Sequence, residues 1–205
     1  MTPSLLHRPL SLAGAALVAA SLWLAPAAQA AVVSLSGQLA AHNSQVRVAF
    51  STSGAGTVSL ITSGWDHGVN FDPMLTLFNA SGRRVDSNDD DALSPFDPLG
   101  NYDARIDATL GTGNWLLVLT AAPNAANGSQ LGDGFAYDAE TPIDIAAWDQ
   151  PSYDPNTPDS HKGAQWALSL SGVDSAHTVP EPTTLALVVA GLLAALRLAR
   201  RNRNF

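Results

Sequence analysis

The stretch ARIDATLGTGNWLLVLT, residues 104–120, contains two strand patterns separated by a turn. In Ala104–Leu110, apolar residues alternate with polar ones, which is the period of two expected for a half-buried strand. Gly111-Thr112-Gly113 provides a flexible turn, and Trp115–Thr120 is then almost continuously apolar. A strand covered on both faces has that composition, so Trp115–Thr120 is predicted to lie at the centre of a sheet.

Strand patterns recur on both sides of this pair, and no segment between the two chain ends has a convincing amphipathic helical period. The further predicted strands are Val32–Leu39, Gln45–Ser51, Thr57–Thr62, Met74–Phe78, Arg83–Val85 and Ala164–Ser171. Residues 121–134 and 144–163 are predicted to be irregular, since they are rich in Asn, Gly, Pro and Asp. About eight antiparallel strands at these spacings predict an all-β fold, a single β-sandwich or jelly roll over residues 31–174.

The predicted domain is strongly acidic. Residues 31–179 contain 17 acidic and five basic side chains, a formal net charge of −12. Such a surface repels phosphate backbones, so nucleic acid is excluded as a partner. The chain contains no cysteine, so a packed core or a bound metal must stabilise it without disulfides.

The N-terminus has the composition of a secretory signal peptide over residues 1–30. His7 and Arg8 give a weakly basic start, and Leu10–Leu24 is apolar. Ala28-Gln29-Ala30 then matches the small-residue pattern that signal peptidase cleaves, so Ala31 is predicted to begin the mature chain. These features predict an exported protein.

The C-terminus combines a stiff motif, an apolar segment and a basic end. Val179-Pro180-Glu181-Pro182 closes a predicted linker over residues 175–182, because both prolines restrict the backbone to extended geometry. Residues 183–199 are predicted to form a transmembrane helix of about 25 Å at 1.5 Å per residue, with Arg197 snorkelling. Residues 200–205 form a basic tail. Its arginines and Arg197 predict a cytoplasmic C-terminus: Arg197, Arg200, Arg201 and Arg203.

This C-terminal segment resembles the PEP-CTERM sorting signal of Gram-negative bacteria. The resemblance rests on three parts in order: Pro180-Glu181-Pro182, the apolar helix and the arginine cluster. It implies processing by an exosortase, a membrane cysteine transpeptidase. It also implies a precursor anchored in the inner membrane, then a protein at the cell surface or in the extracellular matrix, often beside an exopolysaccharide.

Residues 45–120 resemble the pre-peptidase C-terminal type of bacterial β-sandwich. The resemblance is carried by short pieces in a fixed order: Asp72-Pro73-Met74-Leu75-Thr76-Leu77-Phe78, Asn88-Asp89-Asp90, Ala104-Arg105-Ile106 and Gly113-Asn114-Trp115-Leu116. It implies a binding or accessory role and no catalysis.

The densest polar cluster follows the fifth predicted strand and has two interpretations. Adjacent carboxylates repel one another unless a cation or water screens them, and the D-x-N-x-D spacing of Asp86, Asn88 and Asp90 suits a Ca²⁺ loop. The candidate ligands are Asp86, Asn88, Asp89, Asp90, Asp91 and Asp103. An EF-hand is excluded, because Asp91 occupies its glycine position. The alternative is a solvated acidic loop, and Asp72-Pro73 is interpreted as a turn that starts the next strand.

Motifs for catalysis are missing from the sequence: neither G-x-S-x-G nor H-E-x-x-H occurs, and the histidines lie singly. We therefore expect a protein that is not an enzyme, an exported binding or structural sandwich. The alternative is a secreted polysaccharide-active hydrolase that uses Asp pairs. Extracellular polysaccharide is also a candidate ligand, with the ring of Trp65 as its platform.

Overall fold

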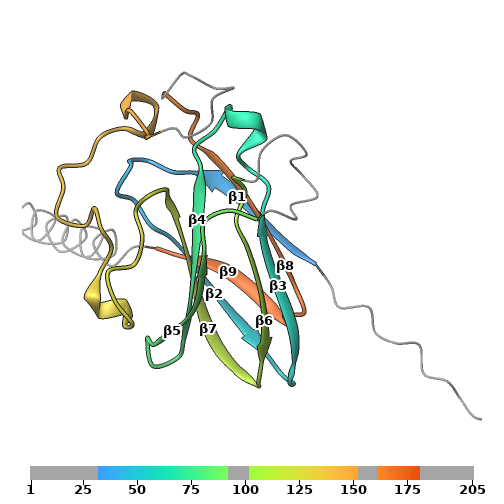
Figure 1. The fold of residues 1–205 in the computed structure, drawn as a ribbon. Coiled ribbons are helices and arrows are strands. Elements are labelled where there is room, and N and C mark those ends of the chain that lie inside the picture. The colour runs from blue at the N-terminus through green and yellow to red at the C-terminus, as the bar shows by residue number, and fades with distance from the viewer. Residues whose placement is uncertain (1–31, 92–101, 152–160, 181–205) are drawn as a thin grey trace, which may run out of the picture.

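A computed structural model describes residues 32–91, 102–151 and 161–180, which form two packed antiparallel sheets (Figure 1). The strands are β1 (Val33–Gln38), β2 (Val46–Thr52), β3 (Gly56–Thr62), β4 (Pro73–Asn79), β5 (Arg84–Asn88), β6 (Arg105–Leu110), β7 (Gly113–Ala121), β8 (Gln165–Ser171) and β9 (Ser175–Val179). Three short 3₁₀ turns lie between them: η1 (Asp66–Gly68), η2 (Leu131–Asp133) and η3 (Ile145–Ala147). No helix within the described ranges has the length and apolar character needed to cross a bilayer.

Several predicted segments lie outside the described residues: the signal peptide, the transmembrane helix, the basic tail, Glu181 and Pro182.

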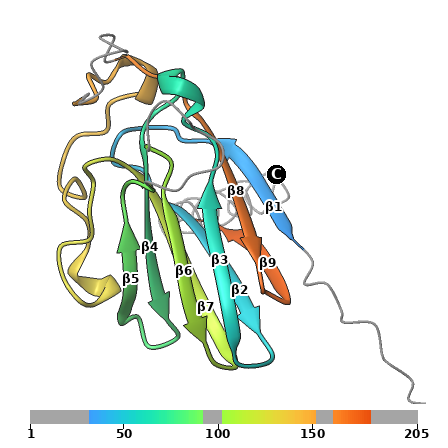
Figure 2. The ribbon, with the colours of Figure 1, turned by 45° about the vertical axis from the view of Figure 1, so that its right-hand side comes forward.

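The four-stranded sheet has the order β1-β8-β3-β6, and the five-stranded sheet has the order β5-β4-β7-β2-β9. Figure 2 shows the two sheets facing each other as layers. The all-β sandwich is thus confirmed, and each of the eight predicted strands is present.

β7 is the central strand of the five-stranded sheet, as its apolar composition predicts. Leu117 and Leu119 point into the main core between the sheets. Val118 points to the other face, where it packs with Phe78 and Phe135 in a second, smaller core. The predicted irregular stretch 121–134 and its continuation to Phe135 therefore do more than connect strands, because they cover the outer face of this sheet.

The main core is built from the inward faces of both sheets. Leu60, Ile106 and Leu168 come from one sheet and pack against Leu75 and Phe50 from the other. All five side chains are buried, as alternation with a period of two requires for half-buried strands. Trp65 is also buried, with 3% of its surface exposed. The ring cannot serve as an open carbohydrate platform in this conformation, so that expectation is wrong.

β9 corrects the predicted linker, because Ser175–Val179 is a strand and not a spacer. It pairs antiparallel with β2 and forms an edge of the five-stranded sheet. Only Ala176 and Val179 are partly buried. An edge strand does not need an alternating apolar face, so its sequence gives little periodic signal.

The pairing register relates the end of β9 to the other strands of its sheet. Val179 stands on one row of paired residues that crosses the sheet through Arg47, Val118, Thr76 and Ser87. The ends of β9 and β5 therefore lie at the same end of the sheet, on opposite edges.

Candidate functional site

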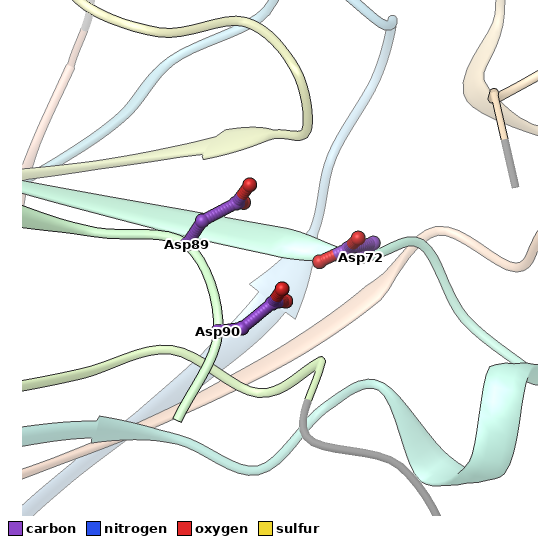
Figure 3. A group of neighbouring side chains, drawn as sticks. All are labelled: Asp72, Asp89 and Asp90. Carbon is purple, nitrogen blue, oxygen red and sulfur yellow. The ribbon is translucent and has the colours of Figure 1, made fainter. Parts of the chain in front are cut away.

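Three aspartates meet where β4 begins and β5 ends. Asp72 directly precedes β4, and Asp89 and Asp90 directly follow β5. The two strands are antiparallel neighbours with Leu75 opposite Asn88, so the start of one lies beside the end of the other. One carboxylate oxygen from each aspartate lies within 4.8 Å of the others. Figure 3 shows the three side chains pointing into a common space.

The position of Asp72 is fixed through its backbone. Its N–H donates to Gln150 Oε1 at 3.1 Å, and its carbonyl oxygen accepts the N–H of Ala122 at 2.8 Å. The Gln150 side chain is 2% exposed and also donates to the carbonyl oxygen of Ala122 at 2.9 Å. A buried glutamine thus joins the start of β4 to the segment after β7, which holds the Asp72 carboxyl group in place.

The three carboxyl groups are held in an unfavourable electrostatic environment. Burial, reinforced by the charges of Asp89, Asp90 and Asp103, raises the pKa of Asp72 to about 9, although Lys162 partly opposes the shift. Burial and the charge of Asp90 raise the pKa of Asp89 to about 6. Burial also raises the pKa of Asp90. Removing carboxylates from water and placing them side by side disfavours their ionised forms.

Two oxygens of the group are left without a hydrogen bond. Asp72 Oδ1 and Asp89 Oδ1 are both inaccessible to solvent and have no hydrogen-bond partner among the described residues. Buried polar atoms in folded proteins nearly always have a partner, so two such oxygens facing the same space need an explanation. A cation bound between them would satisfy both oxygens and offset the repulsion.

The donor set is chemically suited to a hard divalent cation. All three side chains offer carboxylate oxygens, which Ca²⁺ prefers at 2.3–2.6 Å and in sets of six to eight. Three carboxylates supply part of that number, and backbone carbonyls and water commonly supply the rest. The arrangement could therefore hold Ca²⁺, with Asp72, Asp89 and Asp90 as its protein ligands.

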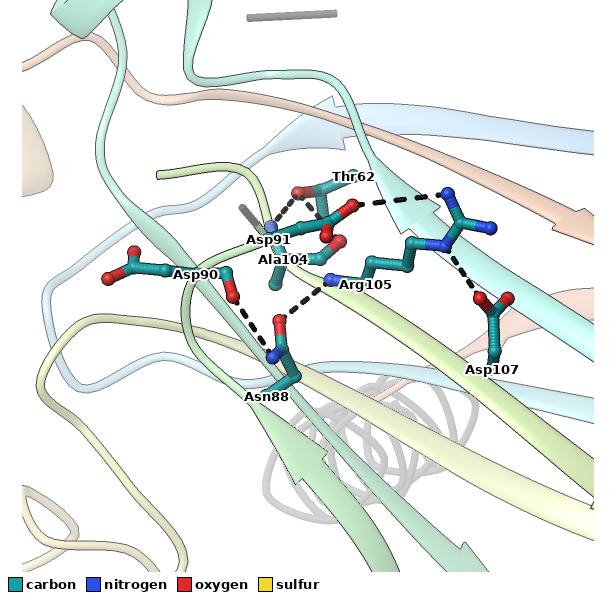
Figure 4. Close-up of polar contacts among 7 residues, drawn as sticks. All are labelled: Thr62, Asn88, Asp90, Asp91, Ala104, Arg105 and Asp107. Carbon is teal, nitrogen blue, oxygen red and sulfur yellow. Dashed lines mark hydrogen bonds and ion pairs between the residues drawn. The ribbon is translucent and has the colours of Figure 1, made fainter. Parts of the chain in front are cut away.

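Only two of the six residues predicted as ligands belong to this group. Asp86 lies within β5 and is exposed, and its Oδ1 accepts the backbone N–H of Ser87 at 2.8 Å. The Asn88 amide closes the loop: it donates to the Asp90 carbonyl oxygen at 3.1 Å and accepts the Arg105 N–H at 2.8 Å (Figure 4). The D-x-N-x-D spacing therefore does not gather three side chains around one point, because Asp86 and Asn88 lie in β5 and only Asp90 follows it.

Asp91 and Asp103 join the two sheets. The Asp91 N–H donates to the Asp103 carbonyl oxygen at 2.9 Å, and Asp91 Oδ2 lies 4.0 Å from Arg105 Nη1 (Figure 4). Asp103 Oδ1 accepts hydrogen bonds from the Thr62 hydroxyl at 2.7 Å and from the Gly64 N–H at 3.1 Å. These contacts give Asp103 a structural role at the end of β3.

Asp72 is the residue that the sequence interpretation missed as a candidate ligand. It stands before a proline at the start of a strand, and that context was sufficient to interpret it as a turn residue. The sequence did contain a signal for it, because the strands now called β4 and β5 were predicted as a consecutive antiparallel pair. Such a pair brings the residue before the first strand next to the residues after the second.

Comparison with known proteins bears on the C-terminal segment. No curated protein matches the chain. Residues 178–203 match the PEP-CTERM protein-sorting motif, which overlaps β9 only at Thr178 and Val179. The likeness of the sandwich to the pre-peptidase C-terminal type stays a prediction. The chain is thus similar to exosortase substrates at its C-terminus, and this motif implies an exported, membrane-anchored precursor. The β-sandwich precedes the motif in the chain.

Proposed function

We propose that this protein is a surface or matrix protein of a Gram-negative envelope, whose sandwich binds or packs and does not catalyse. The observation that carries the proposal is the direct junction between a folded β-sandwich and a PEP-CTERM sorting motif at residues 178–203. A secreted chain with this layout delivers its folded domain to the outside and loses its anchor on processing. The proposed ligand class is an extracellular polysaccharide, and its support is the resemblance of the C-terminal segment to a sorting signal that often accompanies an exopolysaccharide.

The sorting role is tested by replacing Pro180-Glu181-Pro182 with alanines in the full chain. The variant should keep its precursor mass and remain in the inner-membrane fraction of the native host, whereas the wild type is shortened and leaves that fraction. Replacing Pro158-Asp159-Ser160 with alanines is a matched control, because it also removes a proline and an acidic residue. Equal mass and equal fractionation of the motif variant and the wild type would refute the sorting role.

We further propose that Ca²⁺ stabilises the sandwich by binding at Asp72, Asp89 and Asp90. The support is the combination of converging carboxylates with two buried oxygens that lack hydrogen bonds. The protein environment raises the pKa of Asp72 to about 9, so the metal-free group is mostly protonated at neutral pH. A divalent cation would compensate both the burial and the neighbouring negative charges that raise this pKa.

A hydrolase is the second candidate, because two neighbouring carboxyl groups with different pKa values are what acid–base catalysis needs. The pKa of Asp72 is raised to about 9 and that of Asp89 to about 6. Retaining glycosidases, however, separate their carboxyl groups by about 5–5.5 Å and inverting ones by more, with substrate between them. Here a third carboxylate, Asp90, joins the pair, with one oxygen of each aspartate within 4.8 Å of the others, and three converging carboxylates favour a shared cation. Polysaccharide turnover by the wild type that Asp72→Asn abolishes would favour the hydrolase.

A further inference from the structure

The sorting motif begins inside a strand of the folded domain. The match starts at residue 178, and Thr178 and Val179 are the last two residues of β9. Both pair with β2, where Thr178 is opposite Val48 and Val179 is opposite Arg47. Pro180 follows immediately, so there is no spacer between the sheet and the Pro-Glu-Pro motif.

β9 is held firmly at its start. Val173, just before the strand, is buried in the main core. The N–H of Asp174 donates to the Ser51 carbonyl oxygen at 2.9 Å, and Asp174 Oδ1 accepts the Ser53 hydroxyl at 3.0 Å. The Ser51 and Ser175 hydroxyl oxygens are hydrogen-bonded at 2.9 Å. Separating the start of β9 from β2 would pull Val173 out of the core and break the hydrogen bonds of Asp174 and Ser175.

The end of β9 is held much less firmly. His177 and Thr178 are exposed, and Val179 is only partly buried. Ala176 is the last residue of the strand that packs against the main core. Strand ends with few buried contacts open locally at a small fraction of the global unfolding free energy. Three residues at the end of β9 can therefore leave β2 while the sandwich stays folded.

An enzyme that cuts a peptide bond needs extended, unpaired backbone on both sides of that bond. Backbone that is hydrogen-bonded into a sheet cannot be bound by a second protein on the same edge at the same time. Because Pro180, the first residue of the motif, directly follows β9, an enzyme that binds the residues before Pro-Glu-Pro would compete with β2 for the end of β9. The hydrogen bonds between the end of β9 and β2 must therefore break before an enzyme can bind the residues on both sides of the motif.

We propose that the processing enzyme takes its substrate segment from the end of β9, so that residues 177–179 separate from β2 before cleavage. This inference rests on the proposed sorting function. It makes the edge of β2 facing residues 177–179, Arg47 to Ala49, the surface of the sandwich that is uncovered during processing. The strength of this short ladder then sets the rate at which precursor is converted.

Engineered disulfides test the proposal in the full chain, which has no cysteine of its own. Ala49 and His177 are direct partners in the antiparallel ladder, a spacing that a disulfide can bridge. The double variant Ala49→Cys/His177→Cys fixes β9 up to the residue before the motif match. Ser51→Cys/Ser175→Cys is the matched control, because it fixes only the anchored start. Each single cysteine variant controls for the substitution itself.

Precursor conversion is followed by pulse–chase in the native host. The 49–177 cross-link should slow conversion by at least about tenfold, and the 51–175 cross-link should leave it near the wild-type rate. A five-residue Gly-Ser spacer inserted between Val179 and Pro180 should restore conversion of the 49–177 variant, because a flexible linker bypasses the sheet.

Two results would overturn the inference: a 49–177 cross-linked precursor processed at the wild-type rate, or a spacer that restores nothing. The same spacer in the chain without engineered cysteines is a test that needs no cross-link. We expect its precursor to be converted faster than that of the wild type. Equal conversion with and without the spacer would also count against the inference. Failure of the sorting role is distinguishable, since the wild type would then show no exosortase-dependent conversion at all.

Discussion

Replacing Asp72 with asparagine should stabilise the metal-free sandwich at neutral pH, because it removes a carboxyl group that the fold keeps from ionising. Burial, with Asp89 and Asp90 nearby, raises the pKa of Asp72 from 3.8 to about 9. At pH 7 the shift spans about three pH units, which corresponds to an upper limit of about 4 kcal/mol of lost stability. Asparagine has the same shape, but its amide needs partners, so we expect a gain of about 1–3 kcal/mol.

The pH dependence has a definite sign. An unfolded chain ionises Asp72 above about pH 4, whereas the folded metal-free protein keeps the proton up to about pH 9. Folding therefore takes up a proton in that window, and the free energy of unfolding falls as the pH rises from about 4 to about 9. Asp89, with its pKa raised to about 6, adds to the fall between about pH 4 and 6. Asp72→Asn should flatten the upper part of this curve.

Calcium should narrow the stability difference between the wild type and Asp72→Asn, because only the wild type gains from it. A site with a Kd of roughly 10⁻⁴–10⁻³ M adds on the order of 1–2 kcal/mol at several millimolar Ca²⁺, a rise of a few °C in Tm. The wild type should show this rise and Asp72→Asn should not. The assay is thermal unfolding of residues 31–182 in EDTA and in Ca²⁺ at fixed ionic strength, because screening alone stabilises an acidic domain. Mg²⁺, which demands strict octahedral geometry, should give a smaller shift.

Asp86→Asn is the matched control, since Asp86 is an exposed neighbour in β5 that lies outside the cluster. It should keep the full Ca²⁺ shift. The reasoning would be refuted if Asp72→Asn retained the wild-type pH dependence in EDTA. It would also be refuted if Ca²⁺, Mg²⁺ and matched NaCl gave the same Tm.

Two further predictions concern the structural polar groups. His42 is fully buried between the rings of Tyr137 and Trp148 and accepts the Ile143 N–H, so His42→Ala should cost about 3 kcal/mol in urea unfolding. A loss below about 1 kcal/mol would show that the loop repacks around the cavity. Asp103→Ala should also cost about 3 kcal/mol, since it removes the carboxylate that accepts from the Thr62 hydroxyl and the Gly64 N–H. Asp86→Ala should cost less than about 0.5 kcal/mol. Equal losses in the two variants would contradict the structural role of Asp103.

Most of the strands could be predicted because the core selects one of their faces. β5 has no buried residue, and its prediction came from the turn that precedes it. Leu60 and Leu168 lie on the inward faces of their strands, and Trp115–Leu119 of β7 is continuously apolar because both faces of that strand are covered. β9 escaped prediction because it is short, at an edge and mostly exposed, so no periodic pattern distinguishes it from a linker. The covering role of residues 121–135 likewise has no local signature, since it depends on which face Val118 presents.

The candidate site shows a different limit. The spacing of Asp86, Asn88 and Asp90 suggests a metal loop only if the three residues are in a loop, and β5 extends to Asn88. On a strand, a side chain two residues away points the same way but lies about 6–7 Å further along. Asp72 is brought to Asp89 by strand pairing, across 17 positions of sequence. A pairing register is needed to find such a residue.

The shared end of β9 and β5 places the candidate site at the end of the sandwich where the sorting motif begins. Because Val179 and Ser87 stand on one row, the carboxylates of Asp72, Asp89 and Asp90 are on the side of the domain where the anchor attaches. The opposite pole carries the turns at residues 53–55 and 111–112, which are tied together by the Thr112 hydroxyl and the Ser53 carbonyl oxygen at 2.9 Å. This pole lies at the end of the sheet away from Val179 and the sorting motif, so an epitope inserted at Gly54 should not disturb the motif.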